Sequence, residues 1–211
     1  MNSQISPKDF AFLRKMVLEQ GAIEASIITT DKIVVEDRIV FKCKVGCMNY
    51  GTTLSCPPHT PTAEEFRKIV NEYKYALFMK FTSSAKADAN LAKNLSKPID
   101  DPSISKETKE ELIKFWSLWN KDKLKHLTIM LNLEKAAMRK GYPLATGLVS
   151  GYCKLCDKCT LDRKTCRHPT KARYSEEAVG VNVQATAKNA GLIFTYPFKD
   201  NPESFALLLI T

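Results

Sequence analysis

The residues of this chain with the most chemical potential are its seven cysteines, which fall into two groups. In the denser group, Cys153, Cys156 and Cys159 are each separated by two residues, and Cys166 follows after six more. Ferredoxin-type loops use such a triplet to hold three corners of a [4Fe–4S] cube and take the last thiolate from downstream. Zinc sites more often show two separated Cys-x2-Cys pairs. The spacing therefore favours an iron–sulfur cluster over zinc.

The second group lies far upstream and consists of Cys43, Cys47 and Cys56. No cysteine is scattered through the apolar runs, where a buried structural thiol is usually found. A disulfide framework is the alternative interpretation. The odd cysteine total and the absence of a secretory signal count against it. We therefore expect all seven thiols to serve one or two metal centres.

Further motif residues accompany both cysteine blocks. They form the patterns Cys43-x3-Cys47-x2-Tyr50-Gly51-x4-Cys56-Pro57-Pro58 and Cys153-x2-Cys156-x2-Cys159-x6-Cys166-Arg167-His168-Pro169. With these patterns the chain resembles an uncharacterised family of cysteine-rich, predicted metal-binding proteins (DUF2284), and the likeness continues through 172–180 to 190–192. The resemblance implies a metal or iron–sulfur site and no particular reaction. Tyr174 stands where this family is expected to carry proline, but no candidate ligand is missing.

The ligand count leaves three models open. In the simplest, the four downstream cysteines complete one [4Fe–4S] centre, and the three upstream cysteines hold a second centre with an open position. An open iron can bind a substrate group, whereas a fully ligated cluster only passes electrons. In the second model His59 fills the vacant corner. In the third, Cys166 joins the upstream group, as happens when two-cluster ferredoxins exchange ligands between loops.

The charge of the chain points to acidic partners. Its formal net charge is +9, which suits an acidic redox protein or an anionic small molecule. Nucleic-acid binding is not favoured, because no basic patch with interleaved aromatic residues accompanies the charge. Arg167, Lys171 and Arg173 follow the last cysteine, where they would stabilise the negative charge of a cluster or receive a carboxylate.

Neither end of the sequence predicts a membrane segment. The first ten residues lack the charged and apolar regions of a signal peptide. The apolar run from Phe205 to Ile210 is far too short to span a bilayer. We therefore expect a cytoplasmic protein with no membrane association.

Hydrophobic periodicity predicts the elements of the first half. A helix is expected over 8–20, ending at Gly21. Two or three strands follow, at 27–28, 33–35 and 39–41, and the last would lead directly to Cys43. The Cys56-Pro57-Pro58 stretch must be irregular. A capping pattern at 62–65 starts a helix to about residue 73, and a buried strand covers 75–81.

The second half contains one long helix and several short elements. We expect a surface excursion over 83–105, then a helix from Ser105 to Gly141 with Trp116 and Trp119 on its core-facing stripe. A strand at 144–149 leads to the second cysteine block. A helix at 182–189 and strands at 193–194 and 205–210 close the chain. The order predicts an α+β fold with helices packed on a mixed sheet and both cysteine loops at strand ends.

We interpret residues 1–211 as one metal-binding domain, in which 83–140 is a helical excursion and 151–180 is the cluster loop. Outside the cysteines, His168 is a hydrogen-bond donor to a cluster or a structural residue, and His126 is expected to be solvated. Ser175, Glu176 and Glu177 resemble a helix start, which capping explains without catalysis.

Three function classes remain. The first is a redox module with one or two [4Fe–4S] clusters that transfers electrons to or from a partner. The second is an enzyme that binds a small substrate at the open iron of a three-cysteine cluster. The third is a structural or sensory zinc protein, which would be colourless and redox-silent.

Overall fold

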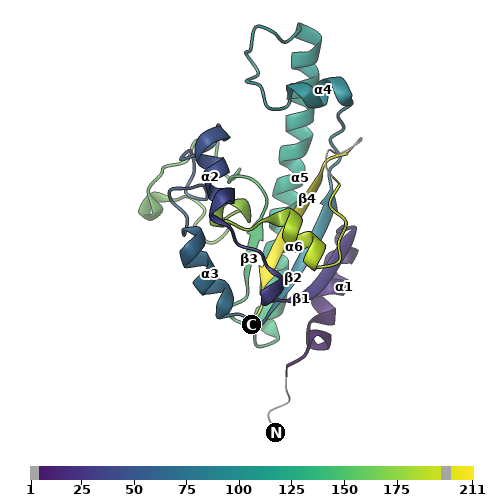
Figure 1. Cartoon of the computed structure of the whole chain (residues 1–211), viewed down its shortest axis with the longest axis vertical. Helices are drawn as coiled ribbons and strands as arrows, with labels where there is room; N and C mark the ends of the chain where they lie inside the picture. Colours follow the sequence, from purple (N-terminus) through teal and green to yellow (C-terminus); the bar gives the residue numbers. More distant parts are fainter. Residues whose placement is uncertain (1–4, 196–200) are drawn as a thin grey trace.

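The computed structural model describes residues 5–195 and 201–211. An antiparallel sheet forms its centre, with the strand order β1-β2-β4-β3 (Figure 1). The strands are β1 (Glu24–Thr29), β2 (Tyr75–Thr82), β3 (Thr146–Val149) and β4 (Glu203–Leu209). Strand β3 therefore lies at an edge of the sheet, although it precedes β4 in the chain.

Six α-helices surround the sheet within the described residues. They are α1 (Ala11–Glu19), α2 (Asp37–Gly46), α3 (Ala63–Asn71), α4 (Ala89–Asn94), α5 (Lys106–Arg139) and α6 (Val183–Asn189). Short 3-10 turns lie at η1 (Pro7–Phe10), η2 (Thr30–Lys32), η3 (Arg163–Thr165) and η4 (Glu177–Val179). None of the helices in 5–195 and 201–211 combines the length and apolar character that crossing a membrane requires.

Strand β2 divides the core into two layers because its side chains alternate between the faces of the sheet. Leu77 and Met79 pack on one face against α1 and α5, through side chains such as Leu13 and Leu133. Phe78 points to the other face and stacks on Phe205 of β4, with ring centroids 5.3 Å apart. Helices α3 and α6 cover this second face. The result is a three-layered helix–sheet–helix arrangement.

The first part of α5 extends beyond the sheet together with the α4 segment (Figure 1). A third, smaller apolar cluster holds them together, and it includes Leu91, Leu112 and Phe115. Trp119 packs against this cluster, whereas Trp116 is 36% exposed. The expectation that both tryptophans belong to the core is therefore confirmed for Trp119 only.

The α+β class is confirmed, and so are the helix ending before Gly21, the α3 helix, the β2 strand and the long α5 helix. The sheet, however, is antiparallel throughout rather than mixed. Residues 33–35 contribute only an isolated bridge between Val35 and Val181, and Ile193–Phe194 form no strand. These short apolar runs therefore do not join the central sheet.

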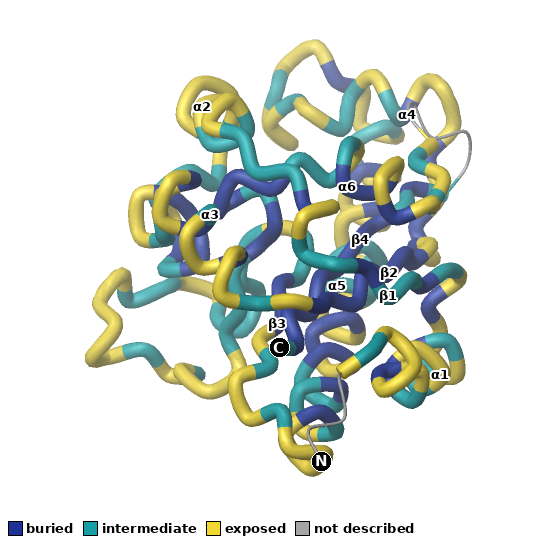
Figure 2. Tube along the Cα trace, turned by 60° about the horizontal axis from the view of Figure 1, so that its bottom comes forward, coloured by how far each residue is buried: buried dark blue, intermediate teal, exposed yellow. Residues whose placement is uncertain are grey.

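The prediction of a strand at 39–41 is wrong, because these residues form the middle of α2. Their β-branched and aromatic side chains suggested a strand. The structure leaves them outside the core, and Phe41 is 62% exposed. No face of α2 is buried in the chain itself (Figure 2). Consequently only the second cysteine block follows a strand, and the first begins at the end of a helix.

Candidate metal centre

The two cysteine blocks lie side by side, although about a hundred residues separate them in the chain (Figure 1). The segment that follows the second block, 176–182, is held by residues from both ends of the first. Glu36 N donates to Gly180 O at 2.8 Å, and Asn182 N donates to Val34 O at 2.7 Å. From beyond Cys56, the Thr60 hydroxyl donates to Ala178 O at 2.9 Å. These contacts, rather than two strand ends, hold the cysteine blocks next to each other.

A line of hydrogen bonds, partly buried at Cys153 and buried at Ser55 and Thr53, connects the blocks directly. Cys153 N donates to the Ser55 hydroxyl at 2.9 Å. Ser55 Oγ and Thr53 Oγ1 are 3.0 Å apart, and Thr53 Oγ1 donates to Cys56 Sγ at 3.3 Å. Because each hydroxyl has one proton, the line runs in one direction, from the Cys153 amide through Ser55 and Thr53 to the Cys56 sulfur. Ser55 is 3% exposed, so water does not compete for these bonds.

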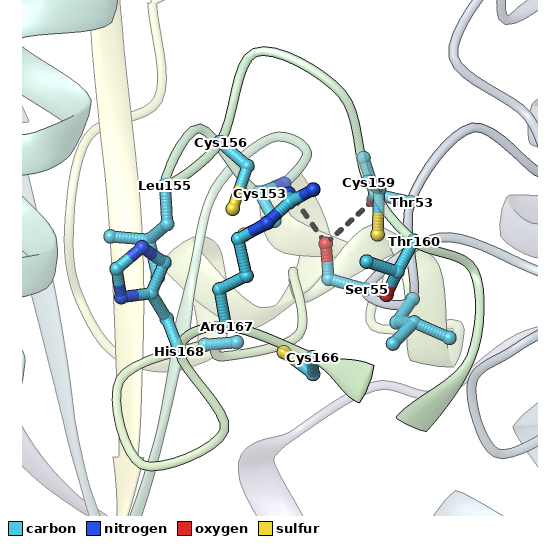
Figure 3. A pocket seen from close by; sticks show the side chains of 12 residues that line it. Thr53, Ser55, Cys153, Leu155, Cys156, Cys159, Thr160, Cys166, Arg167 and His168 are labelled. Carbon is cyan, nitrogen blue, oxygen red and sulfur yellow. Dashed lines mark hydrogen bonds between the residues drawn. The ribbon is translucent and has the colours of Figure 1, made fainter. Parts of the chain in front are cut away.

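The four cysteines of the second block line one cavity together with Thr53 and Ser55 of the first (Figure 3). The loop that carries them is closed at its base by a hydrogen bond from Val149 N to Tyr174 O, 3.0 Å long. Beside this closure, Arg173 makes a bidentate ion pair with Glu134 of α5. The same carboxylate accepts from Gly147 N of β3 at 2.7 Å. A strand and a helix thus anchor an otherwise irregular loop.

The first block is built differently. Cys43 lies in the last turns of α2, and Cys47 caps that helix with its N–H donating to Cys43 O at 3.3 Å. A tight turn then leads to Cys56. Gly51 sits in this turn with φ +71°, a conformation that favours glycine, and its N–H donates to Pro57 O at 2.8 Å. Gly51 therefore shapes the turn between Cys47 and Cys56.

Electrostatic coupling shows that the thiols of each block are neighbours. Burial raises the pKa of the Cys43 thiol to about 11, with smaller contributions from Cys47, Glu177 and Cys56. Burial is likewise the main cause that raises the pKa of Cys153, followed among the raising causes by its three neighbours Cys156, Cys159 and Cys166. The pKa of Cys56 is also raised by burial, and Cys153 contributes to that shift. The two groups therefore form one cysteine-rich region.

The donor set of this region fits a thiolate-ligated metal centre. All seven cysteines are free thiols; Cys47 is exposed, Cys56 is buried and the others are partly buried. Within the described ranges, however, no three Cys, His, Asp or Glu side chains form a group that could hold a metal ion. The four thiols of the second block share one cavity, whereas Cys43, Cys47 and Cys56 do not line it.

The three histidines have different surroundings. His168 lines the cysteine cavity (Figure 3), which is compatible with the donor role expected from its sequence position. His59 is exposed in the turn after Cys56, and its ligation stays a prediction. The expectation that His126 is solvated is wrong. It is 8% exposed, stacks on Phe81 at 4.2 Å between ring centroids and lies 3.3 Å from the Ser204 hydroxyl. Burial lowers the pKa of His126 to about 4.

The basic residues after Cys166 separate into two roles. Arg167 lines the cysteine cavity and donates to Lys158 O at 3.0 Å, so it can contribute positive charge there. Lys171 is exposed. Arg173 is instead held by protein acceptors and neutralised, because Nη1 donates to two backbone oxygens and Nε and Nη2 bind Glu134. Arg173 therefore anchors the loop and is not free to receive a ligand carboxylate.

Several residues of this region carried no recognisable sequence signal. Thr53 and Ser55 are ordinary loop residues until folding places Ser55 against Cys153. Ser175 accepts from Ala178 N at 3.1 Å and so stabilises the start of η4, although the N-cap position of that turn is Glu176. Glu176, by contrast, is completely buried, and in the part of the chain that the structure describes neither of its carboxylate oxygens has a hydrogen-bond partner. Burial raises its pKa well above the usual range. Helix capping does not explain Glu176.

Comparison with known proteins adds one finding. The model of a family described as predicted metal-binding proteins (DUF2284) matches residues 26–210. The chain belongs to this family. No curated protein and no solved structure matches it. Family membership thus confirms the resemblance carried by the two cysteine blocks, and it predicts metal binding without identifying the metal.

Proposed function

We propose that this protein is an iron–sulfur protein in which Cys153, Cys156, Cys159 and Cys166 hold a [4Fe–4S] cluster. The observation that carries the proposal is that these four thiols line one cavity of a loop anchored on β3 and α5. Their sequence spacing, three cysteines at short intervals and one downstream, is that of a ferredoxin-type loop.

A cluster and a single zinc ion require different distances between their thiolate ligands. With a Zn–S bond of about 2.3 Å, the sulfurs of a tetrahedral zinc site lie roughly 3.8 Å apart. No described group of three such side chains could hold a single ion. A cubane contains several metal and sulfide atoms between its ligands, so its thiolates are farther apart. The preference for a cluster therefore rests on the compressed spacing of the second cysteine block.

We further propose that Cys43, Cys47 and Cys56 hold a second centre, and that the pair serves electron transfer or the redox support of a partner. A bound [4Fe–4S] cluster supplies reversible one-electron chemistry. The hydrogen bonds from Cys153 through Ser55 and Thr53 to Cys56 fix the two sites against each other. Exposed Cys47 and α2 offer a partner access, and the net charge of +9 favours an acidic one.

A second candidate function is supported by the first block itself. It has three cysteines, and Cys47 is exposed to solvent. A centre with three protein thiolates would have an open position that a small substrate can reach, which is the arrangement of a cluster enzyme. Ligation by His59 would instead complete the set. We place all of these activities in the cytoplasm, where thiols stay reduced.

The test is chemical analysis of anaerobically purified protein for iron, acid-labile sulfide and zinc, with an absorption spectrum of the same sample. About eight iron and eight sulfide per chain indicate two [4Fe–4S] centres, and about four of each indicate one. Reversible bleaching by dithionite without any substrate supports the electron-transfer role. Stoichiometric zinc without sulfide or visible absorption would overturn the iron–sulfur proposal and leave a structural or sensory zinc protein.

A further inference from the structure

A second cavity of about 210 Å³ adjoins the cysteine cavity at the end of the edge strand β3. The two cavities share Leu54, Ser55, Cys166 and Ala172. The remaining lining of the second comes from β3 and from the loop on either side of Cys166: Thr146, Gly147, Leu148, Arg163, Pro169, Arg173 and Tyr174. Nothing in the metal-centre proposal uses this space.

Two arginines line the cavity, and only one of them is paired with a carboxylate. Arg173 is neutralised by Glu134, whose side chain is 13% exposed. Arg163 has no such partner, because no ion pair of Arg163 occurs within residues 5–195 and 201–211. Its Nη2 donates to the Tyr174 hydroxyl, and its guanidinium lies 5.8 Å from the centroid of the same ring. One positive charge therefore faces the cavity without a carboxylate.

Together with Arg163, Tyr174 offers two hydrogen-bond donors to a ligand in the cavity. Its oxygen accepts a hydrogen bond from Arg163, so its own O–H proton is free to donate to a ligand. A guanidinium and a hydroxyl that donate to the same anion give charge-assisted hydrogen bonds, which are stronger than neutral ones. The rest of the wall is largely apolar, with Leu54, Pro169 and the buried Leu148.

We propose that this cavity binds a small monocarboxylate with a hydrocarbon body, its carboxylate held by Arg163 and Tyr174. A single unpaired guanidinium matches one negative charge and would leave a second carboxylate unneutralised. The volume is below the 300 to 1,000 Å³ of pockets for drug-sized ligands, which limits the ligand to a short chain or a single ring. Because Cys166 lines both cavities, the ligand lies beside the proposed cluster site.

The test uses hexanoate as the probe and hexanamide as its uncharged counterpart, with binding measured by isothermal titration calorimetry on anaerobically purified full-length protein. We expect hexanoate to bind with one site per chain. Hexanamide should bind about tenfold more weakly, which corresponds to about 1.4 kcal/mol. Arg163→Gln should weaken hexanoate binding about tenfold, and Tyr174→Phe should weaken it less.

Lys164→Gln is the matched control, because it removes one positive charge from the neighbouring residue, which does not line the cavity. It should bind hexanoate like the unchanged protein. The proposal is overturned if hexanoate gives no binding heat and no saturation-transfer NMR signal, if Arg163→Gln binds unchanged, or if Lys164→Gln loses as much affinity as Arg163→Gln. Metal content is measured on the same samples. Hexanoate binding by a protein without iron would refute the proposed function and leave this inference standing.

Discussion

The two cysteine blocks contrast in how the fold supports them. The second block is an irregular loop, yet its base is fixed by β3, by the Arg173–Glu134 ion pair and by the bond between Val149 and Tyr174. The first block begins on a regular helix, yet no residue of α2 is buried. Regular secondary structure therefore does not indicate which block has the more buried supports. What fixes a ligand loop is the burial and pairing of the residues at its base.

The contrast extends to the thiols. Cys153, Cys156, Cys159 and Cys166 are all partly buried around one cavity. The thiols of the first block instead differ widely in solvent exposure: Cys47 is exposed, whereas Cys56 is only 7% exposed. We interpret the second block as the more protected site and the first as the site open to partners or small molecules.

We expect the largest effect on metal content when one candidate ligand is removed from each block in turn. Cys156→Ala should eliminate the second-block centre and lower iron from about eight to about four per chain, because a cubane needs its thiolates. Cys47→Ala should remove the other centre and leave the second block loaded. Iron, sulfide and the absorption spectrum of both anaerobically purified variants check this.

The same pair tests ligand exchange between the blocks. If Cys156→Ala empties both sites while the protein stays folded by circular dichroism, the two blocks do not hold independent centres. Cys166→Ala then identifies the shared ligand, since the exchange model assigns it to the upstream group.

Thiol reactivity gives the next largest effect. In reduced, chelator-treated protein at pH 7, Cys47 should react with iodoacetamide about a hundredfold faster than Cys43, because alkylation requires thiolate and Cys43 is shielded. Burial raises the pKa of Cys43 to about 11. Its thiolate fraction, and so its rate, should therefore rise about tenfold per pH unit above neutrality.

Peptide mass spectrometry over a time course resolves the two cysteines. Urea-unfolded protein is the reference, in which both should react at similar rates. Equal rates for Cys43 and Cys47 in the folded protein would contradict the burial difference within the first block.

The anchors of the two blocks should differ in strength. Glu134→Gln removes the charge that pairs with partly buried Arg173 under the second block, and we expect a loss of about 3 kcal/mol in the free energy of unfolding. Glu36 at the start of α2 accepts from Arg38 and Asn182 but is solvent-accessible. Glu36→Gln should therefore cost less. Urea unfolding of both variants measures the difference, and equal losses would argue against a better-anchored second block.

We expect the smallest change in the free energy of unfolding from removing the hydrogen bond between Ser55 and Cys153. Ser55→Ala leaves the partly buried Cys153 N–H without its acceptor, which costs about 1 to 2 kcal/mol. Ser103→Ala, at an exposed position, is the control and should change stability by less than about 0.5 kcal/mol. Urea unfolding at constant metal content checks the values. A Ser55 variant as stable as the control would show that the blocks do not depend on this hydrogen bond.

Local signals in the sequence were sufficient for much of the fold. The Thr62 capping box, the Ser105 cap and the apolar run of β2 predict α3, the start of α5 and the central strand, because each depends on short-range hydrogen bonding or periodicity. The prediction of a strand at 39–41 is wrong because β-branched and aromatic residues are enriched in strands, whereas here they lie in a helix. Here α2 leaves them outside the core, and only the tertiary structure shows this.

The sequence by itself determined the candidate ligands, since cysteine chemistry and spacing are written in the chain. Only the tertiary structure decided how the two blocks meet. The contacts of Gly180, Asn182 and Ser55 join residues far apart in the sequence. The same holds for Arg163 and Arg173, which look alike in the sequence. Glu134 neutralises Arg173, whereas Arg163 faces a cavity without a carboxylate. The difference arises because folding brings Glu134 of α5 next to only one of the two arginines.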